Sequence, residues 1–185
     1  MFRNCLFVIS SILWLTCSPP LAAAEISGSS LPSQALVQEI LVWLSDSFDL
    51  PAVKVAPTIE FASAARLAML RKHDGGLATD IRKDPAVPAQ AGQDSDIVAV
   101  YDRSSETIFL PIGWAGATAA EQSILVHELV HHVQKVAQIR FDCPMAAEKL
   151  AYLAQDRWLE RFGSSLEGEF QVDRFTIVIS TACFH

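Results

Sequence analysis

The chain has 185 residues and a formal net charge of −7 at pH 7, and 51% of its residues are hydrophobic. That length suits a single domain with a proper hydrophobic core. Because the chain is acidic, it is a poor candidate for binding nucleic acid, and we expect no such partner.

Residues 1–24 have the pattern of a secretory signal peptide. Arg3 supplies the positive start, residues 6–15 form the apolar stretch, and residues 22–24 are small, as at a cleavage site. A lipid anchor at Cys17 is the weaker alternative, since the residues before it suit lipoprotein processing poorly. We therefore predict an exported protein, periplasmic or secreted.

The mature chain is then residues 25–185, which we interpret as one domain. Its charge becomes −8, because cleavage removes one of 14 basic residues and none of 21 acidic ones, and 13 − 21 = −8. The apolar stretch of the signal is too short for a comfortable membrane span, and no later segment reaches that length. We expect no membrane span in the mature form.

Two cysteines, Cys143 and Cys183, remain after cleavage. One pair of cysteines in an oxidising compartment predicts a disulfide, which would tie the C-terminal tail back to the middle of the chain. The alternative interpretation makes Cys143 a zinc ligand.

The first part of the mature chain alternates between helical and strand patterns. In chain order the predictions are a helix from Ser30 or Ser33 to about Phe48, strand pieces at 53–55 and 58–61, a short helix over 63–71, and a loop over 73–95. Pro57 lies between the two strand pieces, which favours an edge strand or a bulge.

The second part predicts a β-hairpin followed by two helices. Strands at 97–101 and 107–110 flank a short polar link and lead into a helix around residue 127. Pro144 begins the next helix, which runs to about Phe162 and is stopped by Gly163. The tail from 170 is ambiguous, because Asp173 can either cap a short helix or precede a strand. The fold class is α+β.

The most informative stretch is His127-Glu128-Leu129-Val130-His131, which reads H-E-x-x-H. In a helix, residues i and i+4 lie on one face, so both imidazoles can bind one Zn²⁺. Thr118 and Glu121 have the spacing of a capping box at the start of this helix. Apolar residues recur at helical spacing around the motif: Ile124, Leu125, Leu129, Val133 and Val136. The alternative interpretation is two core histidines bonded to backbone carbonyls, with a solvated Glu128.

His132 lies about 100° around the helix from His131, so it does not share the metal face. We interpret it as a surface histidine or one that supports a ligand from behind.

Catalytic zinc takes three protein ligands. The metzincin pattern H-E-x-x-H-x-x-G-x-x-H is excluded, since Gln134 and Ala137 occupy its glycine and last histidine positions. Glu148, seventeen residues after His131, is on the edge of the next helix's buried stripe and is the preferred third ligand. The alternative is a Glu favoured by the helix dipole or paired with a base.

Three other carboxylates follow on the same part of the chain. Glu160 and Glu167 are weaker ligand candidates, because they lie in more polar surroundings. Asp156, two turns after the preferred ligand, is a candidate for orienting a ligand histidine.

With these residues, the chain resembles the zincin metallopeptidases of the gluzincin type over roughly residues 97–162. The resemblance implies a zincin-like fold with a small, mostly antiparallel sheet, a motif helix and a following ligand helix. It also implies one Zn²⁺ held by His127, His131 and Glu148, with Glu128 as the catalytic base. The chain departs from thermolysin-like enzymes, in which the ligand Glu follows an Asn and has an Asp four residues after it. In this chain those two positions hold Ala147 and Tyr152. It looks more like the minimal zincin cores of small exported bacterial proteins.

The implied chemistry is hydrolysis of a peptide or protein substrate. Zn²⁺ would lower the pKa of a bound water, and Glu128 would take its proton and pass it to the leaving amine. The strand at 107–110 would pair with an extended substrate by β-augmentation. Tyr152 is the first candidate for stabilising the oxyanion, with a core aromatic as its alternative role. Weaker candidates for that role are Tyr101, His73 and His185.

Three hypotheses remain open at this point. The first is an exported zinc-dependent peptidase or amidohydrolase. The second is a catalytically inert zincin-fold module that binds zinc or a partner. The third is an unrelated mixed α/β domain with a chance motif.

Overall fold

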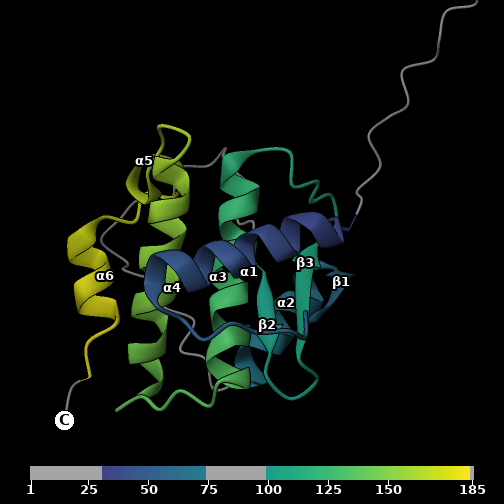
Figure 1. Ribbon diagram of the computed structural model, residues 1–185, viewed down its shortest axis with the longest axis horizontal. Coiled ribbons are helices and arrows are strands. Elements are labelled where there is room, and N and C mark those ends of the chain that lie inside the picture. The colour runs from purple at the N-terminus through teal and green to yellow at the C-terminus, as the bar shows by residue number, and fades with distance from the viewer. Residues whose placement is uncertain (1–30, 74–98, 184–185) are drawn as a thin grey trace, which may run out of the picture.

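The computed structural model describes residues 31–73 and 99–183. The predicted signal peptide, most of the predicted loop and His185 lie outside these residues. The elements, shown in Figure 1, are α1 (Gln34–Phe48), β1 (Thr58–Ala62), α2 (Ala64–His73), β2 (Val100–Asp102), β3 (Thr107–Pro111), α3 (Ala119–Val136), α4 (Pro144–Glu160), α5 (Leu166–Phe170) and α6 (Arg174–Ser180). The predicted α+β class is confirmed, with helices predominating around a three-stranded sheet.

The sheet has the order β1-β3-β2 and is mixed. β2 and β3 form the predicted antiparallel hairpin, whereas β1 pairs with β3 in parallel through the crossover that contains α2. The prediction of a mostly antiparallel sheet therefore holds for only one of the two strand pairs. β1 begins directly after Pro57 and lies at an edge, as the proline predicts. The predicted strand piece at 53–55 is wrong, because that segment has no strand partner.

β3 is the central strand, which overturns one functional prediction. Its backbone is paired along one side with β1 and along the other with β2, so no free edge remains for a substrate. An added strand can pair only at the outer sides of β1 or β2.

Both faces of β3 are buried. Phe109 packs toward α2 with Ala62, Leu67 and Val100, while Ile108 and Leu110 belong to the main core. This alternation follows from the two-residue period of a strand. Helices thus cover both sides of the sheet, with α2 on one side and α1 and α3 on the other.

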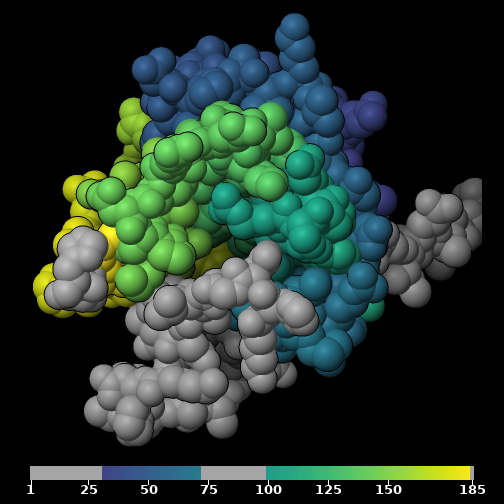
Figure 2. All heavy atoms as spheres, turned by 90° about the horizontal axis from the view of Figure 1, so that it is seen from below, coloured from purple at the N-terminus to yellow at the C-terminus, as the bar shows by residue number. Residues whose placement is uncertain are grey.

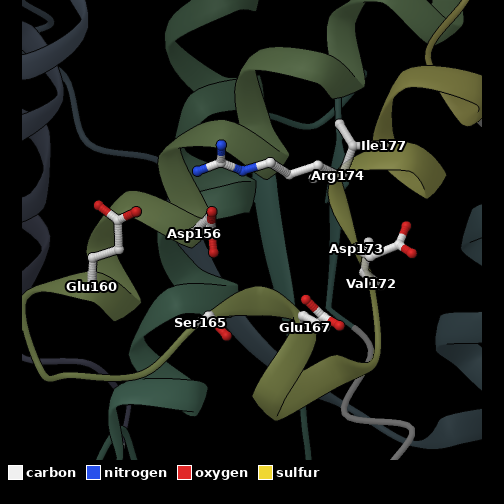
Figure 3. A pocket seen from close by; sticks show the side chains of 8 residues that line it. All are labelled: Asp156, Glu160, Ser165, Glu167, Val172, Asp173, Arg174 and Ile177. Atoms are coloured by element: carbon white, nitrogen blue, oxygen red, sulfur yellow. The ribbon is translucent and has the colours of Figure 1, made fainter.

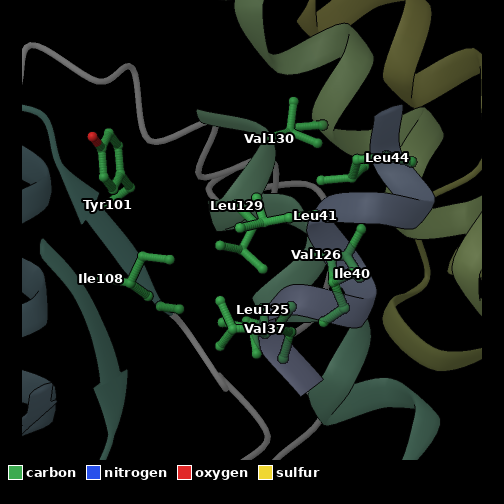
Figure 4. Close-up of a cluster of buried hydrophobic side chains, with 14 of the residues drawn as sticks. Val37, Ile40, Leu41, Leu44, Tyr101, Ile108, Leu125, Val126, Leu129 and Val130 are labelled. Atoms are coloured by element: carbon green, nitrogen blue, oxygen red, sulfur yellow. The ribbon is translucent and has the colours of Figure 1, made fainter. Parts of the chain in front are cut away.

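The main core brings α1, the sheet, α3 and α4 together. Figure 4 shows the aliphatic side chains of α1 and α3 facing Tyr101 and Ile108 of the sheet. The ring of Trp43 on α1 meets that of Trp158 on α4 edge-on, with centroids 5.1 Å apart. Helix α1 therefore packs against both α3 and α4, which also contact each other directly and lie side by side in Figure 1.

Helix α3 begins where the sequence predicts. The hydroxyl of Thr118 accepts a hydrogen bond from the Glu121 backbone N–H, and the Glu121 carboxylate accepts one from the Thr118 backbone N–H. This reciprocal pair is the predicted capping box. It fixes the start of α3 two turns before His127.

Helix α4 presents small residues to α3. Ala147, Ala151 and Ala154 are buried and follow one another at helical spacing. Short side chains let two helix backbones approach closely. Longer side chains at the margins of this alanine face can therefore reach across to α3.

The C-terminal tail consists of helices. Asp173 caps α6, which settles the ambiguity between a helix and a strand. The predicted disulfide between Cys143 and Cys183 is confirmed and joins the start of α4 to the end of the tail. In Figure 2 the yellow C-terminal segment lies beside the green turn between α3 and α4. None of the helices in the described ranges 31–73 and 99–183 is long and apolar enough to cross a bilayer.

Candidate metal centre

His127, His131 and Glu148 come together at the interface of α3 and α4. The two histidines are one turn apart on α3, and their ring centroids are 5.0 Å apart. Oε2 of Glu148 on α4 lies 3.2 Å from Nε2 of His127 and 3.4 Å from Nε2 of His131. The structure thus brings together the three residues predicted as ligands.

The spacing of these atoms suits a metal ion. One ligand atom from each residue can be chosen so that all three lie within 4.8 Å of one another. Ligands about 2.05 Å from a tetrahedral zinc ion are about 3.3 Å apart, which is close to both observed N–O distances. The donor set of two imidazoles and one carboxylate is also one that zinc uses in catalytic sites. The three residues therefore form a group that can hold a metal ion.

The outer nitrogen of each imidazole contacts a side-chain amide. Nδ1 of His127 lies 3.1 Å from Oε1 of Gln155, and Nδ1 of His131 lies 3.1 Å from Oε1 of Gln134. The alternative of two core histidines held by backbone carbonyls is therefore wrong. The imidazoles are anchored from behind by glutamines, which leaves both Nε2 atoms directed at Glu148.

Asp156 was predicted to orient a ligand histidine, and that prediction is wrong. Its Oδ1 atom accepts a hydrogen bond from the backbone N–H of Leu166, so it fixes the start of α5 instead. Gln155, the preceding residue, takes the predicted role. Position 155 is seven residues after Glu148, which places both on one face of α4 and is the signal that could have identified it.

Electrostatics favour an ion pair in the metal-free site. Burial disfavours the charged form of His131, but the Glu148 carboxylate outweighs it and raises the pKa of His131 to about 9. Burial likewise opposes the charge of Glu148, but the two imidazoles lower the pKa of this carboxyl below its usual value. Once His131 releases its proton, the charged carboxylate lies beside two imidazole nitrogens, and this set of atoms is suited to receive a cation.

Glu128, the predicted base, is buried rather than solvated, with 7% of its surface exposed. Burial raises its pKa, although the neighbouring His127 and His131 oppose this shift. The backbone N–H of Tyr101 on β2 donates a hydrogen bond to its carboxylate. The strand next to α3 therefore fixes the orientation of this carboxylate.

His132 is not a surface histidine, contrary to the first of its two predicted roles. It is fully buried, and its Nε2 lies 2.8 Å from the carbonyl oxygen of Val55. Because a carbonyl can only accept, Nε2 carries the proton and Nδ1 accepts from the Tyr101 hydroxyl, 3.2 Å away. His132 thus attaches α3 to β2 and to the segment before β1. The Tyr101 phenol is directed at His132, which removes it as an oxyanion candidate.

Tyr152 lies beside the site, one turn after Glu148 on α4. Its ring meets that of His127 edge-on, with the centroids 4.9 Å apart. Cys143 is in the disulfide and is therefore not a metal ligand.

Glu160 and Glu167 lie elsewhere. They line a separate hollow among α4, α5 and α6, together with Asp156 and Asp173, as Figure 3 shows. Neither belongs to the group of donors that can hold a metal ion. Their exclusion as ligands agrees with the preference for Glu148.

The fold and site define an α+β domain in which two histidines and one carboxylate, on adjacent helices, form a group that can hold a metal ion. The chain belongs to the family DUF6647, described as a domain of unknown function, whose model matches residues 29–185. Comparisons with curated proteins and with solved structures found no match.

Proposed function

We propose that this protein is an exported zinc-dependent metallopeptidase of the gluzincin type. The observation that carries the proposal is the convergence of His127, His131 and Glu148 at distances that fit one tetrahedral ion. Zinc is the proposed metal because nitrogen and carboxylate donors in a three-ligand set suit it. The disulfide agrees with a non-reducing compartment and so supports export.

The chain's own residues supply the remaining parts of a hydrolytic site. Zinc bound there would acidify a water ligand and polarise a scissile carbonyl. Glu128 lies next to His127 in the chain, and its raised pKa moves it toward the range in which a carboxylate works as a general base near neutral pH. It would take a proton from water and deliver it to the leaving amine.

Tyr152 and the edge strand β2 complete the proposal. The Tyr152 hydroxyl would donate to the developing oxyanion, because its ring is adjacent to His127 and to the helical turn of Glu148. A peptide substrate would lie along the outer side of β2, because this edge strand is the one whose backbone reaches Glu128.

Replacement of Glu128 by Gln tests the proposed chemistry. The variant should bind zinc as the wild type does and lose hydrolysis of a peptide library, because an amide cannot accept the proton. Glu60→Gln on the exposed side of β1 is a matched control that should retain activity. If Glu128→Gln digests the library as fast as wild type, the base assignment is wrong. If zinc-loaded wild type cleaves nothing, the inert binding module is the better description.

A further inference from the structure

Two glutamines are buried between α3 and α4 at the metal group. Gln134 is completely buried and Gln155 is 5% exposed. A buried amide is costly unless both its oxygen and its nitrogen find partners, so the orientation of each amide can be derived from its neighbours.

The orientation of Gln134 follows from a backbone carbonyl. Its Nε2 lies 2.9 Å from the carbonyl oxygen of Ala147, which can only accept a hydrogen bond. The amide nitrogen must therefore face Ala147, and the amide oxygen faces Nδ1 of His131. Since an amide oxygen can only accept, Nδ1 of His131 must carry a proton.

The orientation of Gln155 follows from a serine. The hydroxyl of Ser123 donates to the carbonyl of Ala120 at 2.7 Å, so its oxygen can accept from Nε2 of Gln155 at 3.3 Å. The amide oxygen then faces Nδ1 of His127, which must also be protonated. Because Nδ1 of each imidazole is bonded to an amide oxygen, Nε2 is the nitrogen that faces Glu148 and that can bind a metal once it carries no proton.

We propose that Gln134 and Gln155 are positioning residues of the metal site. Each amide fixes the ring plane and the tautomer of one ligand histidine, and each also bonds from one helix to the other. The same two side chains therefore contribute both to metal affinity and to the contact between α3 and α4. This inference rests on the metal site of the proposed function and adds residues that the H-E-x-x-H motif does not contain.

The group behind each imidazole is a neutral amide and not a carboxylate. A carboxylate behind each imidazole would add negative charge to a site that already contains Glu148 and, close by, Glu128. An amide oxygen orients the ring without that charge. The site therefore keeps Glu148 as the one anionic ligand among the three residues.

The test measures zinc binding in variants of the full mature chain. Gln134→Met and Gln155→Met keep the side-chain length and remove the acceptor, and each should weaken zinc affinity by about 10- to 100-fold in competition with a chelator. Gln155→Glu should keep affinity within a few-fold of wild type, because a carboxylate accepts from Nδ1 and the Ser123 hydroxyl can turn toward it. Gln38→Met on the exposed face of α1 is the control and should not change affinity.

A second measurement does not depend on the variants folding. Ring ¹⁵N spectra of zinc-loaded wild type should show both histidines bound through Nε2 with a proton on Nδ1. Binding through Nδ1 at either ring would overturn the proposal. So would unchanged zinc affinity in both folded Met variants, because a merely structural role would alter stability alone. Wild type that takes up no zinc would overturn this inference and the proposed function together, whereas zinc uptake without hydrolysis would leave this inference standing.

Discussion

The disulfide between Cys143 and Cys183 should contribute a large part of the stability of this fold. Its two residues are 40 positions apart, and between them lie α4, α5 and α6. In the chain-entropy model, closing a loop of that length removes about 4 kcal/mol of unfolded-state conformational freedom at 25 °C. Replacing both cysteines by serine should therefore lower the free energy of unfolding by up to about 4 kcal/mol.

Urea denaturation of the metal-free mature protein measures this effect directly. In a domain of this size such a loss should lower the melting temperature by about 10 °C. Reduced wild type is the matched control and should behave like the double serine variant. The reasoning would be refuted if the variant unfolded within about 1 kcal/mol of oxidised wild type, or if unreduced wild type contained free thiols.

The remaining predictions concern the site. Burial opposes the charge of His131 but the Glu148 carboxylate outweighs it, so its pKa of about 9 keeps a proton on the ring at pH 7. Apparent zinc affinity should then rise about tenfold per pH unit from pH 7 toward 9 and level off above, and a flat profile would contradict this. Tyr152→Phe keeps the ring contact with His127, so kcat should fall by about 10²- to 10³-fold with zinc affinity unchanged; equal turnover would exclude an oxyanion role. His132→Leu should destabilise the protein by about 3 kcal/mol in urea denaturation, because the side chain is fully buried and its hydrogen bonds with the Tyr101 hydroxyl and the Val55 carbonyl are both lost; wild-type stability would refute that account.

The part of the site that the sequence predicts well is the part carried by local patterns. Thr118 and Glu121 mark the start of α3, and the i, i+4 spacing puts His127 and His131 on one face. Glu148 could also be predicted, because a carboxylate at the margin of an apolar helix face requires a partner or a metal. These signals operate within one or two helical turns.

The features that escaped prediction depend on contacts between distant segments. His132 is polar and follows the candidate ligand His131, yet it can be buried because its ring donates a hydrogen bond to the Val55 carbonyl, 77 residues earlier. Gln155 and Asp156 are adjacent in the chain. The seven-residue spacing from Glu148 favours Gln155, and the packing of α3 against α4 brings its amide to His127.

The strand order is a further case of the same kind. The hairpin is local, but the parallel pairing of β1 with β3 depends on a crossover through α2 and buries the strand that was expected to be free. Parallel pairing leaves no short-range sequence signal, because its partners are far apart in the chain.

The most direct test of the central claim is a zinc titration of the metal-free mature protein, followed by calorimetry, in wild type and in Glu148→Ala. Glu160→Ala is the matched control, because Glu160 is on the same helix but lies outside the metal group. Wild type and the control should bind one zinc ion per chain, and Glu148→Ala should bind it at least about 100-fold more weakly while remaining folded. Absence of saturable uptake in wild type, or equal affinity in Glu148→Ala, would contradict the assignment of this metal centre.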